Sequence, residues 1–178
     1  MALTEAVGPI TSATMNSNFI MNPEPVANYA LGVDLLAIPE LAAGFVYGMV
    51  GESHLTEMET CYSGAHDLYG YLATALADVE AFHLIGAIEE FEKFVYHFQL
   101  DAAKCTEMQD DLAAIEAYAQ QFLSPTTLIP TVTKHYALHR RTISADIETF
   151  KTDWAAKSFF AAGRTAADIL VILVGPIE

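Results

Sequence analysis

The sequence predicts an all-α protein, a bundle of five or six antiparallel helices, from three long series of apolar residues. In each series, side chains recur at steps of three and four residues, which places them on one face of an α-helix that must be buried. The first series is Leu55, Met58, Tyr62, Ala65, Tyr69, Leu72, Leu76 and Val79. The second is Leu84, Ile88, Phe91, Val95, Phe98, Ala102 and Cys105. The third is Ile129, Val132, Tyr136, His139, Ile143, Ile147, Phe150 and Trp154.

Composition supports one domain with a sizeable core. Of 178 residues, 53% are hydrophobic and 17% are charged, so we do not expect disorder. The net charge of −15 would be repelled by a nucleic-acid backbone or an anionic membrane surface. No segment supplies the roughly 20 apolar residues that cross a bilayer. We therefore expect neither nucleic-acid binding nor an integral membrane segment.

The elements follow from local signals. Residues 1–25 are rich in Ser, Thr, Asn and Pro, so we expect an extended or docked N-terminal arm before a single helical domain over 26–178. A first helical region is predicted over 26–50, where Pro39 suits the first turn of a new helix and Gly51 ends it.

The remaining helices are expected at positions set by caps and breakers. Ser53 suits the N-cap of one helix, and Ser124 with Pro125 suits the start of another. Gly175 and Pro176 end the last one. The expected ranges are 53–81, then a helix that follows a turn near 82–86 and ends near 104, then 108–122, 125–157 and 159–174.

Cys61 and Cys105 are the only cysteines. In an oxidising compartment they would form one disulfide, which on the chain-entropy model stabilises the fold by about 4 kcal/mol. In the cytosol they would be two small core residues. Cys105 belongs to the second apolar series and Cys61 is adjacent to Tyr62, so both can point inward. The residues themselves leave both alternatives open.

Five segments between residues 41 and 177 carry a resemblance to a known group of proteins: LAAGFVYGM at 41–49, QDDLAAIE at 109–116, DWAA at 153–156, FFAAG at 159–163 and AADIL at 166–170. Together they resemble small, largely uncharacterised two-cysteine helical proteins of ciliates, over about residues 41–177. It implies a disulfide between Cys61 and Cys105 and an extracellular or luminal location, and it implies no catalytic residue. The N-terminus lacks the positive flank and apolar core of a signal peptide. We therefore expect either a cytoplasmic protein or a chain numbered after processing.

Candidate chemistry is sparse. His135 and His139 lie four residues apart on one helical face, a spacing that lets two imidazoles reach one metal ion. However, His139 falls on the third apolar series, and no glutamate follows His135 as a zinc-protease helix requires. We therefore favour core or boundary histidines there. Because motifs for nucleophiles, phosphates and dinucleotides are absent, we expect no enzyme and no cofactor. A metal-dependent enzyme is the minor alternative.

Phe94 and Tyr96 give the best functional hint. Both lie off the second apolar series, so their helix is apolar on more than one side. Such a helix is either central in the bundle or contacts a partner or an apolar ligand. We predict a non-catalytic structural or interaction module that binds copies of itself or another protein, with these two residues as candidate contacts. The alternative is a carrier that encloses a lipid or other apolar ligand between its helices.

Overall fold

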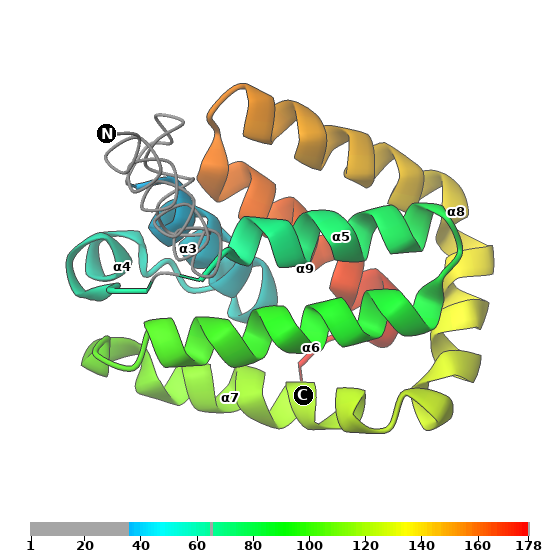
Figure 1. Cartoon of the computed structure of the whole chain (residues 1–178), viewed down its shortest axis with the longest axis horizontal. Helices are drawn as coiled ribbons and strands as arrows, with labels where there is room; N and C mark the ends of the chain where they lie inside the picture. Colours follow the sequence, from blue (N-terminus) through cyan, green and yellow to red (C-terminus); the bar gives the residue numbers. More distant parts are fainter. Residues whose placement is uncertain (1–35, 65, 178) are drawn as a thin grey trace, which may run out of the picture. The chain divides into compact units, whose positions relative to one another are not determined.

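The computed structural model describes residues 36–64 and 66–177, which contain seven α-helices, two short 3₁₀ helices and no strand (Figure 1). This confirms the all-α prediction. The predicted arm, residues 1–25, and the start of the first helical region lie outside the described residues. The elements are α3 (Ala37–Val50), α4 (Leu55–Cys61), α5 (Leu68–Glu80), α6 (Leu84–Asp101), η1 (Thr106–Met108), α7 (Gln109–Ala119), η2 (Gln120–Leu123), α8 (Pro125–Ala155) and α9 (Phe159–Val174).

The predicted count of five or six helices is wrong, because the helix expected over 53–81 is two helices, α4 and α5. Between them, the backbone at Gly64 passes so close to Asp101 that an added Cβ would overlap that side chain. Asp67 then begins α5 as its N-cap and accepts a hydrogen bond from the Gly70 amide at 2.9 Å. The prediction that Ser53 is the N-cap is wrong, because His54 occupies the N-cap position of α4.

The described members of the apolar series are buried or half-buried, except for His139, and Ala65 lies outside the described residues. Every member of the second series is buried, as predicted. In the third series, the prediction that His139 lies in the core is wrong, because its side chain is exposed. Helix α8 is kinked at His139 itself, where φ is −113° and ψ is 15°, while Tyr136 before the kink and Ile143 after it stay buried. Trp154 is half-buried and stacks on Tyr69 with ring centroids 3.8 Å apart.

The helices pack as neighbouring pairs. The antiparallel helices α5 and α6 form a hairpin, and α6 lies between α5 and α7 (Figure 1). Helix α9 packs against both α3 and α8. Phe45 of α3 contacts Phe94 of α6, with centroids 4.5 Å apart, and so joins these groups in one core. None of the described helices combines the length and the apolar character that crossing a membrane requires.

The closest packing in the bundle joins α3 to α9 through glycines. An added Cβ at Gly44 would overlap the carbonyl oxygen of Phe160, and one at Gly163 would overlap the carbonyl oxygen of Leu41. One turn after Gly44, a Cβ at Gly48 would come within 2.6 Å of the Ala167 methyl group. The two backbones therefore touch directly, and no larger side chain fits between them.

We predict that Gly163→Ala lowers the free energy of unfolding by about 2–3 kcal/mol, because its methyl group must push a backbone carbonyl aside. The matched control is Gly86→Ala in α6. There the added Cβ comes within 2.8 Å of the movable Asp78 carboxylate, and alanine's higher helix propensity offsets the contact. Urea unfolding followed by circular dichroism measures both. Equal stability of the two variants would contradict the close α3–α9 contact.

Candidate functional site

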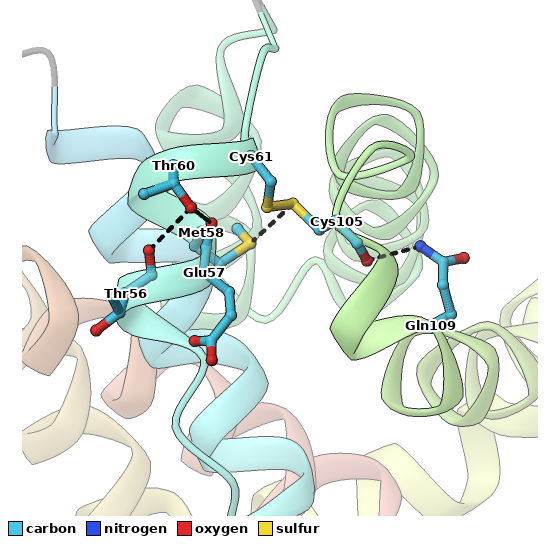
Figure 2. The surroundings of a disulfide bond; sticks show 7 residues. All are labelled: Thr56, Glu57, Met58, Thr60, Cys61, Cys105 and Gln109. Carbon is cyan, nitrogen blue, oxygen red and sulfur yellow. Dashed lines mark hydrogen bonds between the residues drawn. A yellow bond between two sulfur atoms is a disulfide. The ribbon is translucent and has the colours of Figure 1, made fainter.

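The two cysteines join the end of α4 to the segment that follows α6. Figure 2 shows the disulfide between Cys61 and Cys105, whose Cα atoms are 5.1 Å apart. The Met58 sulfur lies 4.0 Å from the Cys105 sulfur, and the Gln109 amide donates to the Cys105 carbonyl at 2.8 Å. This places the sulfur atoms as the predicted pairing requires.

A buried carboxylate reinforces the same junction. Asp101, at the end of α6, is only 6% exposed. It accepts a hydrogen bond from the Tyr62 hydroxyl at 2.8 Å, and its other oxygen lies 2.6 Å from Nδ1 of His66. Burial raises the pKa of Tyr62, as do the hydrogen bond to Asp101 and its negative charge. The hydroxyl therefore keeps its proton and remains a donor.

The other end of α4 is held by a second pair. Nε2 of His54 lies 2.6 Å from Oδ2 of Asp111, in the first turn of α7. Met58 is the single fully buried residue of this short helix. Since so little apolar surface fixes α4, these polar and covalent contacts determine its position.

His135 and His139 lie in different surroundings. Nδ1 of His135 lies 3.0 Å from the Leu173 carbonyl oxygen, a contact that ties α8 to α9. His139 is exposed at the kink of α8. Neither belongs to the one group of three or more potential metal ligands found in residues 36–64 and 66–177.

The two off-series aromatics of α6 point in opposite directions. Phe94 is fully buried, with its ring 4.5 Å from Phe45 and 6.1 Å from Phe98. It is a core residue packed against other rings, which fits the central position of α6. Tyr96 is 59% exposed, so it alone of the pair can meet a partner.

Exposed apolar residues gather at the turn between α5 and α6. Phe82 and Ile85 are both about half-exposed beside an open pocket of about 290 Å³. The pocket is lined by Phe82, His83, Leu84, Ile85, Gly86, Ile129 and Thr133. We call these seven residues the corner surface. The apolar periodicity does not predict this surface. Phe82 lies in a turn, Ile85 lies on the outer side of α6, and Ile129 comes from α8.

A second hollow, of about 520 Å³, lies between α7 and the segment that follows α9. The Tyr118 hydroxyl donates to the Gly175 carbonyl oxygen at 2.8 Å and holds that segment in place. Burial raises the pKa of Tyr118, so this donor stays protonated. The lining mixes small apolar side chains with Gln121 and backbone groups.

The chain matches no protein-family model, no curated protein and no solved structure. Its function is therefore argued from its own surfaces and contacts.

We predict that Cys61→Ala with Cys105→Ala lowers the free energy of unfolding by about 4 kcal/mol, because the pair closes a loop over a separation of 44 residues. Guanidinium unfolding of the oxidised protein and of the double variant measures the difference. Intact mass without reductant should show the native protein 2 Da lighter than its reduced form, roughly the mass of two hydrogens. Two free thiols after aerobic purification would contradict the pairing.

Proposed function

We propose that this chain is a non-catalytic helical module that associates with a second copy of itself through the corner surface. The observation that carries the proposal is that projecting apolar side chains adjoin an apolar hollow on one exposed surface. Phe82 and Ile85 project beside the pocket that Leu84 and Ile129 help to line. In a two-fold contact, each copy can insert Ile85 into its partner's hollow, so one surface serves both sides.

Charge also favours this surface. The chain carries a net charge of −15, which opposes contact between two copies over most acidic faces. None of the seven residues of the corner surface is Asp or Glu. Nearby, Glu80 is paired with Lys151 at 3.2 Å. The Asp78 carboxylate also borders the surface, 3.7 Å from Nδ1 of His83. Association through the corner surface therefore brings fewer like charges together than contact over the more acidic faces.

Phe82 lies at the turn that ends α5, with a φ of 61°, in the left-handed region that costs a non-glycine residue roughly 1–2 kcal/mol. Two backbone hydrogen bonds close the end of α5 in this conformation, from the Phe82 amide to the Val79 carbonyl at 3.1 Å and from the His83 amide to the Asp78 carbonyl at 2.7 Å. The Phe82 ring lies 5.0 Å from that of Tyr136, and the residue is 53% exposed. An aromatic residue left exposed at this turn is available to a partner.

The disulfide supports an extracellular or luminal location. Disulfides form and persist in oxidising compartments and are rare in the cytosol. Cys105 is 2% exposed, and Tyr62, the residue after Cys61, is hydrogen-bonded to the buried Asp101. A structural module that works outside the cytosol would use such a junction to keep α4 in place.

A carrier for an apolar ligand is the second candidate, and the corner pocket is the observation that favours it. Its apolar lining suits a hydrocarbon group, but about 290 Å³ lies at the lower end of the range for small-molecule sites. The buried ring of Phe94 packs against other rings. Native mass spectrometry separates the two functions, since a carrier retains ligand as a monomer and the proposed module forms a ligand-free dimer.

We predict that Ile85→Glu weakens self-association by more than about tenfold, because it places a carboxylate in the apolar contact. Leu100→Glu is the matched control. Leu100 lies on the same helix, has the same 52% exposure, and is about 22 Å from Ile85 at 1.5 Å per residue. Both variants add one negative charge. Sedimentation equilibrium measures the dissociation constants.

The control should associate as tightly as the native chain. Equal weakening by both variants would show that added charge alone disrupts association, and the corner surface would lose its role. A native chain that remains monomeric at the highest soluble concentration would overturn self-association altogether.

We predict that association strengthens with added salt at pH 7 and on acidification toward the sequence pI of about 4.5. Salt screens repulsion among the 23 carboxylates, and acidification neutralises them. Light scattering from pH 7.5 to 5, with circular dichroism to verify retained helicity, measures both effects. Association that weakens with salt would mean that complementary charge pairs hold the copies together.

A further inference from the structure

Three potential metal ligands converge where the connection between α3 and α4 meets the first turn of α7. Nε2 of His54 and Oδ2 of Asp111 are 2.6 Å apart. One carboxylate oxygen of Glu52 joins them, and all three donor atoms lie within 4.8 Å of one another. Among residues 36–64 and 66–177, no other group brings three such side chains together. We propose that Glu52, His54 and Asp111 bind a divalent transition-metal ion, with Zn²⁺ as the best fit.

The chemistry of the three donors selects the class of ion. Zn²⁺ takes imidazole nitrogen and carboxylate oxygen at about 2.0–2.2 Å, whereas Ca²⁺ and Mg²⁺ prefer ligand sets made entirely of oxygen. Tetrahedral coordination places neighbouring ligand atoms about 3.4 Å apart. The His54–Asp111 contact would lengthen slightly and Glu52 would close in. Three protein ligands leave a fourth position, which water can fill.

Burial suits an ion that enters from one side. The side chain of His54 is 12% exposed and that of Asp111 is 24% exposed, while Glu52 is exposed. Two ligands are thus held in place by the surrounding protein, and the third can close from solvent. Partial exclusion of water strengthens the attraction between the two carboxylates and a cation.

The other histidine–aspartate pairs of the described chain lack these features. Asp101 already accepts from the Tyr62 hydroxyl and the His66 ring, so its oxygens are occupied. His83 and Asp78 are 3.7 Å apart, and the His83 side chain is 73% exposed. In residues 36–64 and 66–177, no third His, Cys, Asp or Glu donor atom lies within 4.8 Å of both partners of either pair, although the His97 ring lies 4.3 Å from that of His66. The His83–Asp78 pair therefore provides a natural control.

The ion would fix the N-terminal end of α4, through Glu52 and His54 just before its first residue. The disulfide already fixes the last residue, Cys61. Because Glu52 and His54 precede α4 and Asp111 belongs to α7, the unfolded chain does not hold the three ligands together. Binding would therefore stabilise the native state by mass action.

The test is isothermal titration of ZnCl₂ into the full, disulfide-bonded chain after chelator treatment. We expect one Zn²⁺ per chain and a rise in melting temperature of about 5 °C at saturation. Loss of a residue that only orients a metal ligand lowers metal affinity by about 10–100-fold, so loss of a ligand itself, in His54→Ala or Asp111→Asn, should lower it by at least tenfold. His83→Ala, compared with the native chain at a concentration at which both are monomeric, should leave the Zn²⁺ affinity unchanged. Visible absorption of bound Co²⁺ reports direct coordination.

His54→Ala also removes the hydrogen-bonded pair, so a second variant separates ligation from folding. Glu52→Gln leaves the His54–Asp111 pair intact and should still lower the Zn²⁺ affinity by at least tenfold. The proposal is overturned if the native chain binds no Zn²⁺, if Glu52→Gln binds as tightly as the native chain, or if His83→Ala loses as much affinity as His54→Ala. Equal affinity for Ca²⁺ would also overturn it, because general attraction to acidic groups would then explain the binding.

Discussion

The direct contact between the backbones of α3 and α9 is the constraint on which the rest of the bundle depends. Gly44 and Gly163 leave no room for a side chain, so the two helices meet at a single spacing. This fixes the position of Phe45, whose ring packs against Phe94 of α6 and so helps to position that helix. On its other side, α9 supports α8. A small error at the glycines would therefore displace side chains throughout the core.

Periodicity predicts the buried faces well wherever a helix is regular. The members of the second series from Leu84 to Phe98 are buried because α6 is unbroken and lies between neighbours. The same reasoning fails at His139, since a stripe drawn through the sequence assumes a straight helix and α8 is kinked there. It also fails between α4 and α5. The signals for that break were present in Gly64 and Asp67, but only contact with the distant Asp101 makes Gly64 necessary.

Of the candidate functional features, one could be predicted from the sequence and two could not. The cysteine pair could be anticipated because both residues point inward and because two-cysteine helical proteins offered a resemblance. The corner surface could not, since it combines a turn, the start of α6 and two residues of α8, Ile129 and Thr133. The His54–Asp111 contact joins residues 57 positions apart, and nothing local to either residue indicates the other. Tertiary proximity of this kind leaves no periodic trace in a single sequence.

The disulfide has a mechanical consequence that follows from its place in the chain. Cys61 precedes α5 and Cys105 follows α6, so the bond closes this hairpin into a covalent ring with the corner surface at its tip. Tension applied to the chain before Cys61 and after Cys105 passes across the sulfur bridge and bypasses α5 and α6. A single peptide-bond cleavage inside the ring would likewise leave both pieces attached. The hairpin is thus protected from stretching and from loss by a single cut.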